Sequence, residues 1–107
     1  MLTAEQVKKV ALACGADKVG IGTMDRFEGS PKDYDPRYIM PRAKSIIGIA
    51  IRVHRGLLRG IEEGTYFAGY PSMGYANIND VYAPMVVREL ASFLEDSGYE
   101  ALPYING

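Results

Sequence analysis

Cysteine and histidine, the two residue types that most often bind metals or react, are nearly absent from this sequence. Cys14 and His54 are the single examples in 107 residues. A four-iron cluster needs four thiolate ligands and structural zinc needs several Cys or His side chains, so the chain cannot hold either alone. One thiol also excludes an intrachain disulfide, which favours a reducing compartment. With no signal-peptide pattern at the start, we expect a cytoplasmic location.

Strong charge and long apolar runs are missing too. The chain carries 12 Lys and Arg against 13 Asp and Glu, so it has no excess of positive charge with which to bind nucleic acid or an anionic membrane. Its longest apolar stretch, Ile46 to Ile51, is far shorter than a membrane span. We therefore expect neither a nucleic-acid partner nor membrane insertion.

What the sequence does contain is 48% apolar residues, enough for one core, and we predict a single domain over 1–107. Its clearest helix signal is Thr3 followed by Gln6, a capping-box spacing, with apolar residues then recurring at helical intervals until Gly15. These features predict a helix over Ala4 to Cys14. Cys14 falls on the apolar stripe, which predicts a buried, unreactive thiol.

Three segments are predicted as strands. Lys18 to Gly22 is short, β-branched and flanked by glycine. Ala43 to Val53 contains an unbroken apolar run, which predicts burial on both faces and a central position in the sheet. Ala101 to Ile105 resembles an incoming strand.

The remaining segments are predicted as loops and helices. Asp25 to Pro41 reads as turn and loop with one helical turn near Pro36 to Met40. The Gly- and Tyr-rich interval from Gly56 to Asn77 reads as a long loop with a short helix at Leu57 to Glu62. A helix capped by Asn79 is predicted to run to Asp96. This order predicts an α/β fold, a layered domain of one sheet with covering helices.

Polar residues follow the predicted central strand. Ligands of open α/β sheets collect beyond the carboxyl ends of strands, so Arg52, His54 and Arg55 are candidate binding residues. An imidazole titrates near neutral pH, and the two guanidinium groups suit a phosphate or carboxylate. No Ser, Cys or carboxylate stands at a catalytic spacing from His54, so we predict no catalytic residue and no metal ligand; the alternative is a solvated surface.

Tyrosines cluster from Tyr66 to Tyr82. Tyrosine offers apolar area with a hydroxyl, so Tyr70 and Tyr75 are candidates for the wall of a flat cofactor's pocket. The same side chains are enriched in subunit interfaces and in ordinary packing. Both readings stay open on the sequence.

Three stretches together resemble the N-terminal region of the epoxyqueuosine reductase and reductive dehalogenase group of iron–sulfur proteins. They are Gly15 to Ile21 (GADKVGI), Met40 to Ile47 (MPRAKSII) and Leu90 to Pro103, which ends in LEDSGYEALP. Their order and separation match the family and span most of the chain. The resemblance implies part of a nitroreductase-like fold.

The family couples a cobalamin-binding domain to a later segment that holds two 4Fe-4S clusters. The resemblance therefore implies that 1–107 is the N-terminal portion of an iron–sulfur oxidoreductase, with Arg52, His54, Tyr70 and Tyr75 bordering a corrinoid site. The family's cysteine-rich segment and catalytic acid region have no counterpart in this sequence. The expected partner is the cluster-bearing segment. The alternative is a non-catalytic dimerising or ligand-binding module whose partner is a second copy, with the aromatic loop and the Leu102 to Ile105 edge buried.

Overall fold

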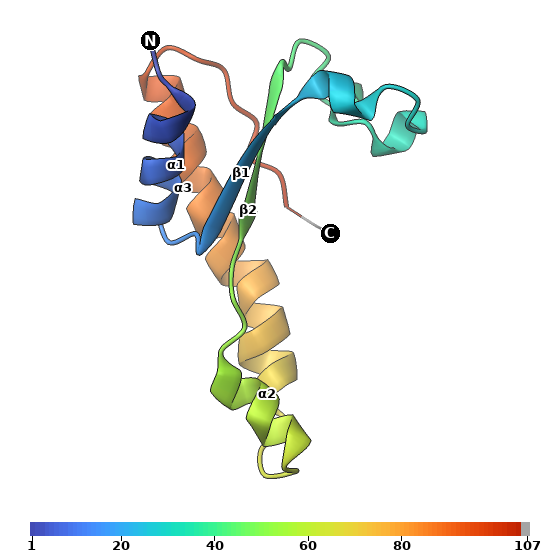
Figure 1. Ribbon diagram of the computed structural model, residues 1–107, viewed down its shortest axis with the longest axis vertical. Helices are drawn as coiled ribbons and strands as arrows, with labels where there is room; N and C mark the ends of the chain where they lie inside the picture. The colour runs from blue at the N-terminus through green and yellow to red at the C-terminus, as the bar shows by residue number, and fades with distance from the viewer. Residues whose placement is uncertain (106–107) are drawn as a thin grey trace.

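The computed structural model describes residues 1–105, so the last two residues of the predicted domain lie outside the described part. It is a small mixed α/β domain with three α-helices and a two-stranded antiparallel sheet (Figure 1). The α-helices and strands are α1 (Ala4–Ala13), β1 (Lys18–Thr23), β2 (Ser45–Ala50), α2 (Arg55–Glu62) and α3 (Ala83–Asp96). The 3-10 turns are Met24–Phe27, Lys32–Tyr34 and Pro36–Tyr38, and the π-helical segments are Tyr70–Ala76 and Ile78–Tyr82.

The first helix forms as the sequence predicts. The Thr3 hydroxyl accepts a hydrogen bond from the Gln6 amide (3.2 Å), and the Gln6 side chain accepts one from the Thr3 amide (2.9 Å). Both bonds satisfy amides that the helix leaves free at its start. Gly15 ends the turn at a φ of +118°, a conformation that favours glycine.

The prediction that β2 is a central strand is wrong for the described residues. β2 pairs with β1 alone, in an antiparallel register that places Gly48 opposite Gly20. Ile47 and Ile49 face the helices and pack against the core, whereas Gly48 and Ala50 on the other face are exposed. The apolar run is unbroken because the open face also carries apolar residues, the partly buried Ile46 and the small Gly48 and Ala50. A hydrophobicity pattern cannot distinguish this arrangement from burial on both faces.

The core is small and lies between α1, α3 and one face of the sheet. Its buried cluster consists of Val7, Ala11, Ala16, Val86 and Leu90. The radius of gyration is 16.2 Å, against about 13 Å for a compact domain of this length. The chain exposes 7923 Å² of surface, about 2,000 Å² more than a compact protein of its mass. The exposed surface includes large apolar side chains such as Phe67 and Met85.

An arm built from α2 and the start of the long C-terminal helix extends away from the sheet (Figure 1). The predicted short helix at Leu57 to Glu62 is confirmed and begins earlier, at Arg55. The later part of the predicted loop is helical, since π-helical turns run from Tyr70 to Tyr82 and lead into α3, whereas residues 63–68 lie outside any helix, as predicted. Asn79 is therefore not a cap: it lies inside a helical segment, where its neighbours' amides already have helical partners.

The segment after α3 is not a strand, which corrects the prediction for Ala101 to Ile105. Those residues have no sheet partner among residues 1–105. Pro103 lacks an amide proton, and the Ala101 amide donates to the Glu95 carboxylate (3.4 Å) rather than to a ladder. Leu102, Tyr104 and Ile105 are all exposed.

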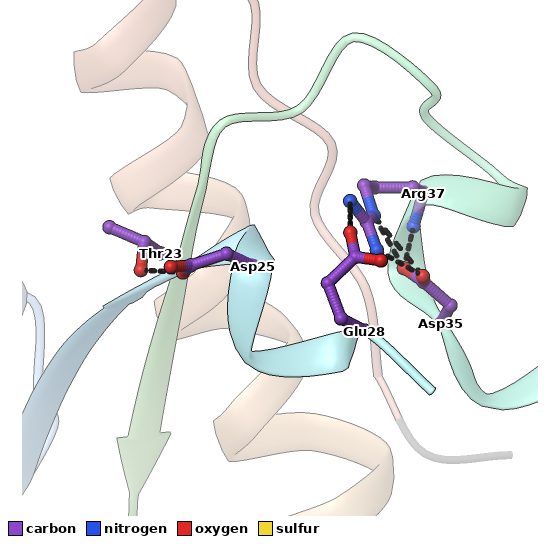
Figure 2. A network of polar contacts seen from close by, with 5 residues as sticks. All are labelled: Thr23, Asp25, Glu28, Asp35 and Arg37. Atoms are coloured by element: carbon purple, nitrogen blue, oxygen red, sulfur yellow. Dashed lines mark hydrogen bonds and ion pairs between the residues drawn. The ribbon is translucent and has the colours of Figure 1, made fainter. Parts of the chain in front are cut away.

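Acidic side chains and one arginine tie together the 3-10 turns between the strands (Figure 2). The Arg37 guanidinium donates to Asp35 (Nη2 to Oδ2, 2.7 Å) and to Glu28 (Nη1 to Oε1, 3.0 Å), and the Arg37 amide donates to Asp35 Oδ1 (2.9 Å). Nearer the sheet, the Thr23 hydroxyl donates to Asp25. The side-chain and then the backbone hydrogen bonds from Arg37 lower the pKa of Asp35.

This network predicts an acid-induced loosening of the turns. Because the pKa of Asp35 is lower in the folded chain than in the unfolded one, the pairing stabilises the fold above about pH 4 and is lost as pH falls through the folded-state value. NMR of the Arg37 Nε–H between pH 5 and 2 should show this loss. Asp35→Asn should abolish the transition, while Asp33→Asn should keep it; a transition that survives in Asp35→Asn would assign it to another carboxylate.

Candidate ligand-binding groove

A groove of about 560 Å³ lies on the helix-covered side of the sheet. Its apolar walls come from Leu2 and Val7 at the start of the chain, Ile21 and Ile47 of the sheet, and Leu94 of α3. The volume lies within the range of small-molecule pockets. The groove therefore offers an apolar surface of ligand size.

Charged side chains stand at the groove's rim. Arg42 Nη2 lies 3.4 Å from Glu100 Oε2, and these side chains are 85% and 65% exposed, so their attraction is weak in water. Lys44 lines the groove and forms no ion pair within residues 1–105. Two cations against one carboxylate give the rim a net positive charge, which favours an anionic group on a ligand.

Local backbone geometry places these charges. The Ala43 amide donates to the Met40 carbonyl (3.0 Å) in a tight turn, and the Met24 amide donates to the Lys44 carbonyl (3.2 Å) just beyond the β1–β2 ladder. On the opposite wall, Gly98 turns the chain at a φ of +97°, and the Tyr99 amide donates to the Leu94 carbonyl (3.0 Å). Tyr99 and Glu100 are thereby held against the groove.

Segments far apart in the sequence meet here. Three stretches singled out in the sequence analysis each contribute to the groove: Gly15 to Ile21 through Ile21, Met40 to Ile47, and Leu90 to Pro103 through Leu94, Tyr99 and Glu100. The other walls come from the first residues of the chain and α1. The fold thus gathers all three stretches around one hollow.

The four predicted cofactor residues lie elsewhere: Arg52, His54, Tyr70 and Tyr75 do not line this groove. Arg52 pairs with Asp17, whose carboxylate accepts the Arg52 amide (2.8 Å) and lies 3.8 Å from its Nε. The rule that ligands collect beyond the carboxyl ends of strands holds for open, mostly parallel sheets. In this antiparallel pair the carboxyl end of β2 lies beside the start of β1, which brings Asp17 to Arg52.

His54 and the tyrosines lie on the arm. His54 is exposed at the start of α2 and makes no side-chain cap. Tyr70 is partly buried, and a Cβ built on Gly74 would lie 3.2 Å from its ring, so Tyr70 packs within its own segment. Tyr75 is 63% exposed. Since Val53 Cγ1 would lie 3.1 Å from that same Cβ, the tyrosine segment packs beside the end of β2, near His54 in sequence.

The described residues contain no set of side chains that could hold a metal cluster. No group of three or more His, Cys, Asp or Glu comes together in residues 1–105. Cys14 is the C-cap residue of α1 and packs against the core. Its side chain is only partly buried, less than predicted. Burial, and then the charge and hydrogen bonding of Glu89, raise the pKa of the Cys14 thiol, which lowers the thiolate fraction on which reactivity depends.

Comparison with protein-family models, with curated proteins and with solved structures finds no match to this chain. Within the described residues, no helix combines the length and the apolar character that crossing a membrane requires.

The sequence prediction missed the groove. Its walls come from separate segments, and an apolar side chain on a groove wall has the same pattern as one in a core. The one local signal was the pair Arg42 and Lys44, which alternate immediately before the apolar run of β2. Two cations beside an apolar strand place charge next to an apolar surface.

Proposed function

We propose that this chain is the N-terminal domain of an iron–sulfur oxidoreductase resembling epoxyqueuosine reductase, and that its groove forms part of a corrinoid-binding site. The 4Fe-4S clusters and the catalytic residues belong outside this chain. The observation that supports the proposal is the meeting of the three family-like stretches around one hollow.

The groove suits part of a corrinoid rather than all of it. A cobalamin, with its macrocycle and nucleotide tail, is larger than the ligands that a hollow of about 560 Å³ encloses. Its apolar edge matches Ile21, Ile47 and Leu94, and its phosphate matches the positive rim at Arg42 and Lys44. The remaining surface of the ligand would contact the rest of the enzyme.

The chain's contribution is binding and orientation. One cysteine cannot ligate a four-iron cluster, and the described residues bring no other ligands together. When bound, a corrinoid would supply the reductive chemistry. The residues of this chain would bind its edge, exclude water from the apolar wall and pair with its phosphate.

Visible absorption tests this proposal. Titration of the chain into hydroxocobalamin should give a saturable shift of the corrinoid bands. Arg42→Ser combined with Lys44→Ser should raise the dissociation constant about tenfold, the equivalent of one charge-assisted hydrogen bond.

The matched control is Lys8→Ser with Lys9→Ser, which removes two exposed cations from α1 outside this groove. That pair should leave binding unchanged. An equal loss in both double variants would indicate non-specific attraction, and the absence of any spectral shift would contradict a corrinoid role for this chain.

A second candidate, a non-catalytic module that associates with another polypeptide, is favoured by the exposed surface. The excess of about 2,000 Å² over a compact protein of this mass is more than one partner contributes to a standard interface. Exposed aromatic residues of the arm, such as Tyr66, Phe67 and Tyr75, are of the types enriched in interfaces.

A further inference from the structure

The outer edge of β2 is an unpaired strand edge. The Met24 amide donates to the Lys44 carbonyl, so Met24 and Lys44 form a hydrogen-bonded pair that continues the ladder. Such pairs alternate along an antiparallel ladder, so the backbone amides and carbonyls of the even-numbered residues of β2 point toward β1. The amides and carbonyls of Ile47 and Ile49 therefore point away from β1. They make no backbone hydrogen bond to another segment of residues 1–105.

Nothing in the strand itself blocks this edge. Natural edge strands are protected by charges, proline, bulges or covering segments, because a bare edge pairs with other chains. β2 reads Ser-Ile-Ile-Gly-Ile-Ala, without a charge or a proline. Charges lie only beyond its ends, at Lys44 and Arg52, and Arg52 is already paired with Asp17. The strand has the sequence of an interior strand and the position of an edge.

The edge of β1 differs. β1 begins with Lys18 and contains two glycines, which weaken a strand. α1 packs against β1, beside which it lies in Figure 1. β2 is therefore the better edge for adding a strand.

We propose that β2 pairs with β2 of a second copy of this chain, antiparallel across a twofold axis, to form a four-stranded sheet. Ile47 of each copy exchanges backbone hydrogen bonds with Ile49 of the other, and the two Gly48 residues meet at the axis. The two Gly48 residues then form a non-hydrogen-bonded pair, the kind at which antiparallel strands lie closest together. Glycine, without a side chain, leaves the most room there. Identical strands satisfy each other's edge groups, as a twofold interface requires.

The surface area of the chain supports a second copy as the occupant. Each partner in a standard interface contributes about 800 Å², and the excess of about 2,000 Å² on this chain exceeds that amount. This inference goes beyond the proposed corrinoid role: the assembly can be measured without any cofactor, so either result stands independently of the other.

Sedimentation velocity of the full chain from about 1 to 100 µM tests the pairing. The wild-type chain should sediment as a dimer of twice 11.8 kDa at the upper concentrations. Gly48→Lys would place two like charges opposite each other at the axis, and the dimer dissociation constant should rise by about 30-fold or more. A Cβ on Gly48 meets nothing within 4 Å, so the monomer should still fold.

Gly20→Lys is the matched control. Gly20 is the β1 partner of Gly48 and is also exposed, and a Cβ on it likewise meets nothing within 4 Å. That variant should keep the dimer. An equimolar mixture of Gly48→Lys and Gly48→Glu should restore dimerisation, because opposite charges then meet at the axis.

Three outcomes would overturn the proposal. They are a wild-type chain that is monomeric up to 100 µM, a dimer that persists in Gly48→Lys, and a dimer that Gly20→Lys disrupts as strongly. The second would assign the interface to another surface, such as the aromatic arm, and the third would implicate the edge of β1.

Discussion

Leu90→Ala should lower the free energy of unfolding by about 2 to 5 kcal/mol, the range for removing a buried leucine side chain. Leu90 is 4% exposed and belongs to the cluster that joins α3 to α1. Only Val7 and Val86 in that cluster have side chains comparable in size, and the other members are alanines. The cluster therefore has little apolar volume with which to fill the cavity.

The loss would be large relative to the whole fold. Small domains are stable by about 5 to 15 kcal/mol, and this one has a small core. Chemical denaturation followed by circular dichroism measures the difference. Leu12→Ala, on the exposed side of α1 at 50% exposure, is the control and should change stability by less than about 0.5 kcal/mol. Equal effects of the two substitutions would show that the packing of α3 against α1 described here is wrong.

Gly60→Ala should destabilise the arm by about 1 to 3 kcal/mol, the usual cost of forcing atoms into a packed site. Gly60 is buried in α2, and a Cβ there would lie 2.9 Å from the Tyr66 carbonyl oxygen. The Thr65 and Tyr66 amides both donate to the Gly60 carbonyl, at 2.9 and 3.1 Å, so this backbone cannot move away without losing hydrogen bonds.

Gly56→Ala in the same helix should have the opposite sign. A Cβ on Gly56 meets nothing within 4 Å, so alanine should stabilise the helix by roughly 0.5 to 1 kcal/mol. Hydrogen exchange of the α2 amides reports both changes locally. If Gly60→Ala were as neutral or stabilising as Gly56→Ala, the chain after α2 would not pack on Gly60 as the structure has it.

The elements that the sequence predicts correctly are those fixed by local chemistry. Thr3, Gln6 and Gly15 determine both ends of α1, because a capping box and a left-handed glycine act within one helical turn. β1 matches its predicted range to within one residue, since β-branched residues and glycines mark it, and β2 lies within its predicted range, which the apolar run marks.

The predictions that failed depend on partners distant in sequence. The apolar run of β2 has the pattern of a central strand, yet whether a second neighbour is present depends on the rest of the assembly. Leu102 to Ile105 has the composition of a strand but no partner edge within residues 1–105. Asn79 is a residue type that often caps helices, but the residues before it are already helical, so there is no helix start for it to cap.

The candidate site also combines features that local sequence predicts with features that depend on distant segments. Arg52 and His54 follow β2, as predicted, but the antiparallel pairing gives Arg52 a structural partner in Asp17. The groove draws on segments that only the folded chain brings together. Lys44 and Glu100 are separated by more than half of the sequence, and no spacing rule connects them.

We propose that a corrinoid, if this chain binds one, contacts the stretches around the groove rather than the strand end and the tyrosines. Amide chemical shifts of the labelled chain during titration with hydroxocobalamin test it most directly. We predict that the largest changes fall on Ile21, Lys44 and Tyr99. Changes concentrated on His54, Tyr70 and Tyr75 instead would contradict this proposal, and no changes at all would contradict a corrinoid role for this chain.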